Sequence, residues 1–375
     1  MHFAIYIVLQ ILVIALFKFG HKADTSIAGI PLFFVIFFCT FLIWIVDFKS
    51  VVKYYNRLLG YFTMLGLCYA AISLIGVFSL FSTIPSDKHY VLRQAYFLPF
   101  LLFAIPVFAQ SFKVGLFKYF LQRRLFFVIF SVAFRLPLPV QYTAILLFSI
   151  NNYSFGLIFL LFISQLHVGY SSQERLMLGL LFVFLITRIN VSPKQISTII
   201  IIMILAGYLF TDEIASFITD INGNAGWRLT VWVACIKSAI NETFLIGHGF
   251  GTAYFPPSSG MYVIYPYDRG NFVTGQHSSF VNIFYRMGIV GLLLFMAYIK
   301  SMAERIRDYN VPNQMNYILL LGMMMIGVNV GLESPGYATT FVFLVALVQY
   351  IISENYKVHW TNEYKKSGNM IEQKQ

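Results

Sequence analysis

The sequence predicts an all-α, polytopic membrane protein, and three observations carry this prediction. The chain has 375 residues, of which 59% are hydrophobic and only 11% are charged. A soluble domain carries about 25% charged residues, so the deficit fits a chain that is surrounded by lipid. Runs such as Ile30–Val46, Gly60–Phe81 and Phe280–Ile299 are close to the ~20 apolar residues that a membrane-spanning helix needs. The runs also lack the alternating pattern of transmembrane β-strands.

About twelve spans are expected along the chain. They cover residues 3–17, 28–46, 59–81, 95–110, 116–134, 137–150, 153–167, 176–187, 196–210, 279–299, 315–331 and 337–353. The first run has no small-residue cleavage site and more spans follow it, so we expect a retained helix rather than a removed signal peptide. The expected organisation is therefore a bundle of about nine helices at 1–210, a loop at 211–278, about three helices at 279–353 and a tail at 354–375.

The positive charge of the chain predicts its orientation. The formal net charge is +11, which is typical of nucleic-acid binding or of basic cytoplasmic loops, and the composition favours the second. With twelve spans, the basic clusters share one side. These clusters are Lys49, Lys53 and Arg57; Lys113, Lys118, Arg123 and Arg124; Arg188 and Lys194; Lys300, Arg305 and Arg307; and the tail lysines. We expect that side and both termini to be cytoplasmic, although Lys18 and Lys22 depart from the rule.

The opposite side carries the only long loop that the span pattern predicts, residues 211–278. Loops longer than about 15 residues are usually functional or disordered, and this one is rich in aromatic residues rather than low in complexity. Within it, Leu229, Trp232, Val233, Ile236 and Ile240 repeat at helical spacing. This pattern predicts an amphipathic helix that lies on the membrane surface or across the mouth of the bundle.

Three residues on the predicted outer side are candidates for catalysis: Arg175, Arg228 and His277. An ionisable group at a membrane boundary is costly unless it faces a polar cavity or a partner. Arginine binds phosphate through a rigid bidentate fork, and histidine can accept a proton from a hydroxyl near neutral pH. Together they would suit a reaction in which an anionic phosphate group leaves.

The candidate substrate-binding residues lie in or beside the same loop. They are Trp232, Tyr265, Tyr267, Arg269 and Gln276. Each candidate has a plainer interpretation. The arginines can extend toward lipid headgroups, the aromatic residues can form an interfacial belt, and His277 can be an ordinary loop histidine. We expect no metal site and no cofactor, because the loop lacks His-x-x-x-His and Asp-x-Asp spacings.

Four pieces of sequence resemble the shared region of the bacterial O-antigen ligase and O-antigen polymerase family. They are Arg228-x3-Trp232, Leu245-Ile-Gly-His-Gly-Phe-Gly251, His277-Ser-Ser-Phe280 and Arg286-Met-Gly-Ile-Val-Gly291. The resemblance runs from Arg228 to Phe295, about a fifth of the chain. The family has a further arginine at the outer mouth of an earlier helix, for which Arg175 is the match and Arg188 the rival. The chain departs from the family in having Ser278 after the histidine, where Asn is usual, and Glu174 before Arg175, where Ser is usual.

The resemblance implies a GT-C-like glycosyltransferase of the bacterial inner membrane that acts at the periplasmic face without a metal and inverts the anomeric centre. The donor would be a glycan on undecaprenyl pyrophosphate. His277 would activate the acceptor hydroxyl or assist the transfer, while Arg175 and Arg228 would hold the pyrophosphate. Other partners would be membrane lipids and a chain-length regulator and flippase of the same pathway, with no nucleic acid.

Three functions stay open at this point. A polymerase of O-antigen or capsule repeat units would use the next lipid-linked unit as acceptor, whereas a ligase would use lipid A–core. Variability is typical of polymerases, and the departures above together with the high Phe, Tyr and Ile content favour that assignment. A flippase or transporter should instead carry charge within its spans or have matching halves, and a non-catalytic scaffold or receptor would use the long loop as a binding surface.

Overall fold

The computed structural model is nearly all helical. It describes residues 2–19, 26–27, 30–80, 88–166, 172–187, 195, 198, 223–252, 278–328, 332 and 334–372. A two-residue antiparallel hairpin, β1 (Ser26–Ile27) and β2 (Ile30–Pro31), is the sheet found in this part of the chain. The predicted all-α class is confirmed, and the core is an apolar cluster that runs through the helices.

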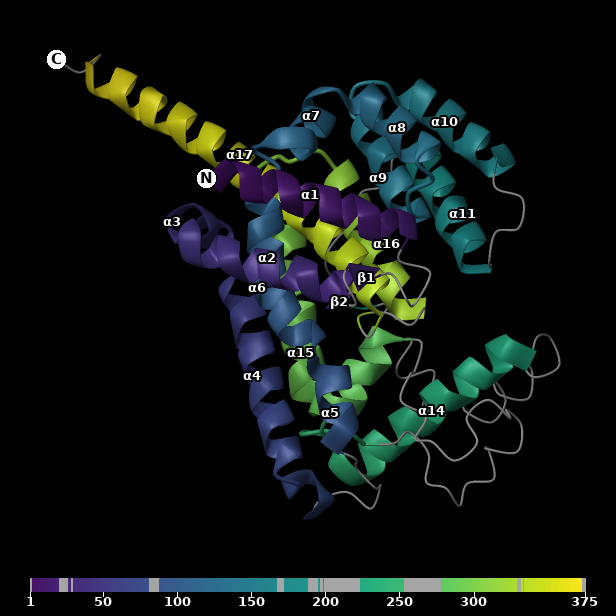
Figure 1. Ribbon diagram of the computed structural model, residues 1–375. Coiled ribbons are helices and arrows are strands. Elements are labelled where there is room, and N and C mark those ends of the chain that lie inside the picture. Colours follow the sequence, from purple (N-terminus) through teal and green to yellow (C-terminus); the bar gives the residue numbers. More distant parts are fainter. Residues whose placement is uncertain are drawn as a thin grey trace.

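Five helices form the centre of the molecule (Figure 1). They are α4 (Arg57–Leu74), α6 (Phe97–Ser111), α15 (Ser279–Asp308), α16 (Gln314–Val328) and α17 (Pro335–Glu372). Helix α17 packs against α6 and α16, and α15 packs against α4 and α16. The middle of α17, from Phe341 to Val348, is buried residue after residue, so this helix is surrounded by protein along that stretch.

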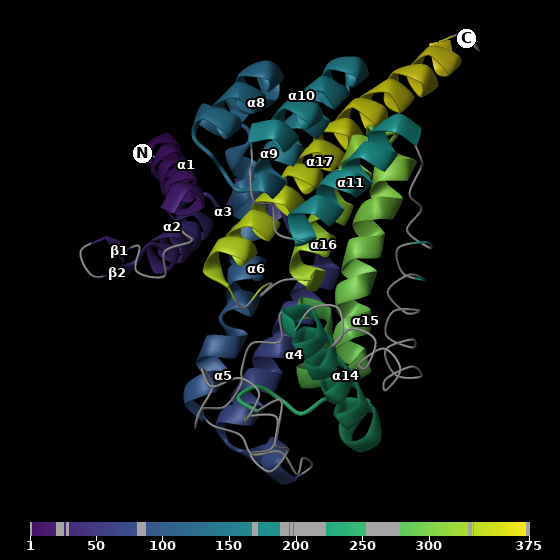
Figure 2. The same cartoon turned by 90° about the vertical axis from the view of Figure 1, so that its right-hand side faces the viewer.

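The remaining helices surround this centre in two groups. On one side, α1 (His2–Phe19) packs on α2 (Leu32–Val46), which bends into α3 (Phe48–Val51) and a 3₁₀ turn at Val52–Tyr54. The second group begins with α7 (Gly115–Gln122), which packs against α1, and continues with α8 (Arg124–Ala133), α9 (Leu138–Ser149), α10 (Tyr153–Leu166) and α11 (Ser172–Thr187), the four helices labelled together in Figure 2. Helices α9 and α11 fasten this group to α16.

Three helices in the described ranges are long and apolar enough to cross a membrane: α4, α15 and the first part of α17, Pro335–Asn355. The number rises to five if two bent pairs each count as one span, α2 with the segment Phe48–Tyr54 at 99° and α6 with α7 at 61°. The membrane class of the prediction is therefore supported, while the count of twelve stays a prediction. Most expected spans correspond to a helix; of residues 196–210 the structure describes only Thr198.

One expected span is not a single continuous helix in the structure. The sequence predicts a single helix over 116–134, but the structure has two helices, α7 and α8, separated at Arg123, whose φ of −117° and ψ of 67° are not helical. Two adjacent arginines, Arg123 and Arg124, interrupt the apolar run at this point, and the Arg124 side chain donates to the carbonyl of Leu147 on α9. The two adjacent arginines therefore mark a corner between two helices rather than the middle of a span.

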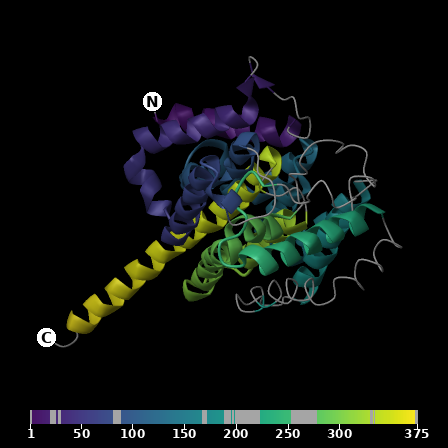
Figure 3. The same cartoon turned by 90° about the horizontal axis from the view of Figure 1, so that it is seen from below.

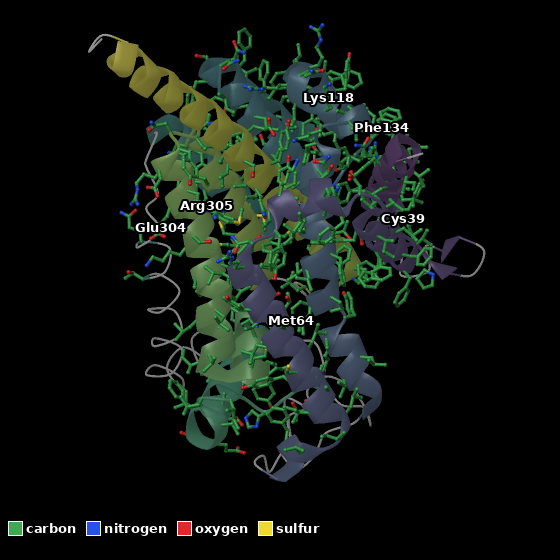
Figure 4. All side chains as sticks on the ribbon, turned by 90° about the vertical axis from the view of Figure 1, so that its left-hand side faces the viewer. Cys39, Met64, Lys118, Phe134, Glu304 and Arg305 are labelled. Carbon is green, nitrogen blue, oxygen red and sulfur yellow. The ribbon has the colours of Figure 1, made fainter. Side chains whose placement is uncertain are left out.

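The bundle has two ends with different character. We call the end with α3 and α7 the basic end, since Lys49, Lys53, Lys113 and Lys118 lie on these elements or beside them, and Figure 4 places Lys118 and Arg305 in this half. We call the other end the loop end. It holds α5 (Lys88–Ala95) and α14 (Gly223–Thr243), and Figure 3 shows α14 beside α15 when the molecule is seen from this end.

Candidate active site

Helix α15 is broken near the loop end. Gly288 has φ of 62° and ψ of −166°, which divides the helix into a short first part and a longer second part. Tyr285, Arg286 and Met287, just before the break, are buried. A break inside a membrane helix leaves backbone groups without their helical partners, and these groups must be satisfied within the protein.

A loop after α14 satisfies those groups. In an unbroken helix the N–H of Ile289 would donate to the carbonyl of Tyr285. Here the Ile289 N–H donates to the Phe244 carbonyl at 2.9 Å, and the Tyr285 carbonyl accepts from the His248 N–H at 2.7 Å. The Gly249 N–H donates to the Arg286 carbonyl at 3.0 Å. We call this backbone pairing of residues 244–249 with residues 285–289 the clasp.

Two glycines make the clasp possible. Gly247 has φ of 68°, and a Cβ there would lie 2.5 Å from the carbonyl carbon of Arg286 and from the nitrogen of Gly288. A Cβ on Gly288 would lie 2.3 Å from the carbonyl oxygen of Leu245. Both positions combine the left-handed backbone that favours glycine with a close backbone approach, which explains two glycines of the resemblance at once.

The chain beyond the clasp is held by two other helices. The N–H of Phe250 donates to the Ser73 hydroxyl of α4 at 2.9 Å, and the N–H of Gly251 donates to the Gln94 side-chain oxygen of α5 at 2.6 Å. The Thr252 hydroxyl turns back to donate to the Gly249 carbonyl. Backbone donors at 248–251 are thus all satisfied, and the segment is fixed to α4, α5 and α15.

Arg286 is a fully buried cation at the centre of this arrangement. Its Nε donates to the Asn282 side-chain oxygen at 2.9 Å, one turn earlier in α15. One terminal nitrogen, Nη1, donates to the Gly249 carbonyl and to both oxygens of Thr252, between 3.0 and 3.2 Å. The guanidinium therefore connects the first part of α15 to the segment that follows the clasp, and oxygen acceptors offset part of its desolvation cost.

His248 is the second polar side chain of the clasp, and it is also fully buried. Its Nε2 lies 3.0 Å from the Ser238 hydroxyl of α14, which in turn donates to the Glu242 carboxylate at 3.2 Å. Because that hydroxyl has one proton, Nε2 of His248 supplies the hydrogen of the first bond. Burial lowers the pKa of His248 to about 4; the charge of Glu242 opposes this effect and the charge of Arg286 adds to it.

Helix α14 confirms the helix predicted inside the long loop, and its contact face matches the prediction in part. The helix begins at Gly223, five residues before Arg228, and continues past Asn241 to Thr243. Val233 and Ile236 of the predicted stripe are buried, whereas Trp232 and Ile240 are half-buried, and the fully buried positions are Val231, Cys235 and Ala239. Residues four apart lie on one face, and small side chains there let α14 approach α15 closely.

The structure describes only some of the predicted site residues. Arg175 lies in the first turn of α11 with an exposed side chain, and Trp232 is half-buried on α14. Arg228 lies within α14, but its side chain is outside the described residues. His277, Tyr265, Tyr267, Arg269, Gln276 and Arg188 also lie outside the described residues. His277 comes directly before Ser278, whose hydroxyl caps α15 by accepting from the Val281 N–H. The convergence of Arg175, Arg228 and His277 stays a prediction.

Several residues in the clasp or bonded to the segments around it had no predicted role. They are Ser73, Gln94, Ser238, Glu242, Thr252, Asn282, His248 and Arg286. The sequence contained one signal for them, because Leu245–Gly251 and Arg286–Gly291 are both pieces of the resemblance. In the described ranges, no group of three or more His, Cys, Asp or Glu side chains is placed to hold a metal ion.

These features define a class, a helical membrane protein with a broken helix and a docked glycine-rich loop at one end. Comparison with known families places the region more closely: residues 153–296 match the model of the O-antigen ligase family. The match runs from the start of α10 through α14 and the clasp into the second part of α15. It confirms the resemblance seen in the sequence and supports a membrane enzyme of the O-antigen ligase or polymerase type. No curated protein and no solved structure matches the chain significantly.

Proposed function

We propose that this protein polymerises oligosaccharide repeat units carried on undecaprenyl pyrophosphate, at the periplasmic face of the bacterial inner membrane. One observation carries the proposal. The clasp joins two separated pieces of the family region, the glycine-rich loop and the broken α15, and both lie within the matched residues 153–296. The family match supports a lipid-linked glycan as substrate.

The orientation follows from the charges of the two ends. The basic end carries the clustered lysines and arginines, which favour the cytoplasm, so we assign the loop end to the periplasm. Cysteine labelling from outside tests this assignment. Tyr262→Cys should react in intact cells and Arg305→Cys should not. The reverse pattern would invert the topology and remove the site from the periplasmic face.

The proposed reaction is an inverting displacement. The acceptor hydroxyl oxygen attacks the anomeric carbon of the donor, the bond from that carbon to the pyrophosphate oxygen breaks, and the pyrophosphate leaves with the electron pair. His277 takes the hydroxyl proton. Arg228 and Arg175 offset the charge that develops on the pyrophosphate, and the loop residues Trp232, Tyr265, Tyr267, Arg269 and Gln276 bind the sugars.

A ligase is the second candidate, since the matching family model is described as an O-antigen ligase. We favour a polymerase because Ser278 stands where the family usually has Asn, and because enzymes that each serve one repeat unit diverge widely. Gene deletion separates the candidates. Loss of a polymerase leaves single capped repeats on the surface, loss of a ligase leaves long chains on the lipid carrier, and loss of a flippase stops the supply of substrate to the outer face. Unchanged polymeric glycan would contradict the proposal.

Purified protein and a lipid-linked repeat unit give the direct test. Wild-type protein should extend the glycan without added metal. His277→Ala should stop extension, and Arg228→Lys should impair it because a point charge cannot replace the bidentate fork. His359→Ala, in the predicted tail, and Arg305→Lys, at the basic end, are the matched controls. Normal chain length in Arg228→Lys would exclude Arg228 from the site.

A further inference from the structure

We propose that His248, as a neutral imidazole, is a positioning residue that fixes α14 on the broken helix α15 and so determines where α14 holds Arg228 and Trp232. The backbone and the side chain of this residue act on different elements. Its N–H donates to the Tyr285 carbonyl of α15, and its Nε2 bonds to Ser238 of α14. The residue therefore joins the two helices directly, in addition to the loop that connects it to the end of α14.

We call this connection between α14 and α15 through His248 the joint. The length of α14 makes the joint important for the position of Arg228. Helix α15 is its main packing partner among the described helices. Ser238 and Arg228 are ten residues apart in the same helix, a distance of about 15 Å at the rise of an α-helix. A small tilt at Ser238 thus becomes a larger displacement at Arg228. A misplacement of about 1 Å in a catalytic group can cost about 100-fold in rate.

The surroundings of the imidazole select its neutral form. Glu242, Lys237 and Cys235 come from α14, and Tyr285 and Arg286 come from α15. The rings of His248 and Tyr285 lie 4.5 Å apart between centroids, and the hydrogen bonds from Phe250 and Gly251 to α4 and α5 go to the neutral side chains of Ser73 and Gln94. Burial disfavours a charged imidazole here more than Glu242 stabilises it, and Arg286 adds repulsion, so protonation of His248 should open the joint.

The direction of the pH effect follows from linkage. The pKa of His248 lies at about 4 in the folded protein, below its ordinary value of 6.5. The contribution of the closed joint is therefore complete above about pH 6.5 and is lost as the pH falls toward 4. Over this interval, the open fraction should rise by at most about ten-fold for each pH unit.

Cys235 reports on the joint without any enzyme assay. It is fully buried on α14 beside the clasp, whereas Cys39 is half-buried and Cys68 is exposed. In full-length protein in membranes, with Cys39→Ser and Cys68→Ser, the rate at which 4,4′-dithiodipyridine modifies Cys235 measures opening. His248→Ala should raise this rate about 10-fold or more at neutral pH, because a buried hydrogen bond is lost and a cavity forms. Ser238→Ala should raise it less, and Ser164→Ala, whose hydroxyl bonds only within α10, should not change it.

His248→Gln separates positioning from mere structural support, and it also covers the case in which His248→Ala does not fold. Glutamine can donate from a similar place but does not titrate. This variant should protect Cys235 as wild type does at neutral pH, and it should lack the extra opening below pH 6.5. Equal reactivity in wild type, His248→Ala and His248→Gln would overturn the proposal, as would an acid-induced opening that persists in His248→Gln.

The consequence for catalysis rests on the proposed function. Extension by His248→Ala should fall mainly in kcat and should be restored by His248→Gln, with the acid limb of the wild-type profile shifted in that variant. If the protein extends no glycan, the proposed function fails while the Cys235 result stands. If extension occurs but kcat and its pH profile are the same in all three proteins, the positioning role fails while the proposed function stands.

Discussion

The two ends of the bundle solve the same problem in different ways. At each end an apolar helix stops being regular and leaves backbone groups without helical partners. At the basic end, between α6 and α7, a single side chain takes over. Gln10 of α1 donates to the carbonyls of Ser111 and Val114 at 3.0 and 2.9 Å and accepts from the Leu116 N–H at 2.9 Å. At the loop end, the backbone of one segment pairs with the backbone of another, and glycines allow the approach.

The charged side chains at the two ends differ in how far they are exposed to solvent. Lys113 and Glu354 form an ion pair at 3.3 Å at the basic end, with side chains that are 31% and 38% exposed. Arg286 at the loop end is fully buried and donates to the Gly249 carbonyl of the clasp and to the side-chain oxygen of Asn282. Water can replace a contact at the basic end but not at the clasp. The loop end thus combines close fit with the family region, which suits a site whose geometry has to be fixed.

The largest effect should come from adding one methyl group to the clasp. Gly247→Ala and Gly288→Ala each put a Cβ within 2.5 Å of opposing backbone at a positive φ, and backbone cannot move aside as a side chain can. We expect a loss of more than about 4 kcal/mol, or no folded protein. Gly179→Ala on α11, where a Cβ meets nothing within 4 Å, is the control and should be neutral or slightly stabilising. Thermal unfolding in detergent measures the melting temperatures of all three variants. A melting temperature for Gly288→Ala equal to that of wild type would contradict the close backbone pairing of the clasp.

Arg286→Met should be the next largest change. Methionine keeps most of the volume but removes the donor to the carbonyls of Gly249 and Thr252 and to the side-chain oxygen of Asn282, and the Gly249 carbonyl keeps only its bond from the Thr252 hydroxyl. We expect a destabilisation of about 3–5 kcal/mol, the range for removing one partner from a buried charged network. Arg307→Met at the basic end is the matched control, because its guanidinium bonds only to the adjacent Asp308 and is 69% exposed. Equal melting temperatures for the two variants would show that burial at the loop end carries no added cost.

The sequence predicted what depends on composition and local periodicity. Apolar runs such as Ile30–Val46 and Phe280–Ile299 correspond to α2 and α15, because a long apolar segment in a membrane has little alternative to forming a helix. The four pieces of the family region were also found, and the two that the clasp joins lie together in space. The pairing itself was not predicted, because it is formed between backbones about 40 residues apart and glycine spacing alone does not identify a partner.

Two errors have local causes. The predicted contact face of α14 included Trp232 and Ile240, which are only half-buried, and missed the small, fully buried residues Cys235 and Ala239. The run 116–134 was predicted as one helix because its apolar content outweighed Arg123 and Arg124. Hydropathy averages hide both features, since they give small residues little weight and spread a charge pair over a window.

A smaller effect is expected at the corner of α6 and α7. Gln10→Leu keeps the side-chain volume but removes the hydrogen bonds to Ser111, Val114 and Leu116. Ser111 is buried, whereas the other two contacts are only partly buried, so water can satisfy some of these groups. We expect a destabilisation of about 1–3 kcal/mol, with extension activity lowered only as far as the folded fraction falls. A loss of activity in fully folded Gln10→Leu would mean that the basic end also positions the site.

The smallest effect should follow loss of the ion pair between Lys113 and Glu354. Both side chains are about one-third exposed, and the Lys113 ammonium also lies 5.4 Å from the ring centroid of Tyr54. Exposed pairs of this kind contribute about 0–1 kcal/mol and are screened by salt. Glu354→Gln should therefore lower the melting temperature slightly at low salt and not at high salt, while Lys113→Ala should keep a small effect at both because it also loses the contact with Tyr54. A salt-independent loss of several degrees in Glu354→Gln would show that the basic end is as exacting as the clasp, and the contrast between the two ends would have to be abandoned.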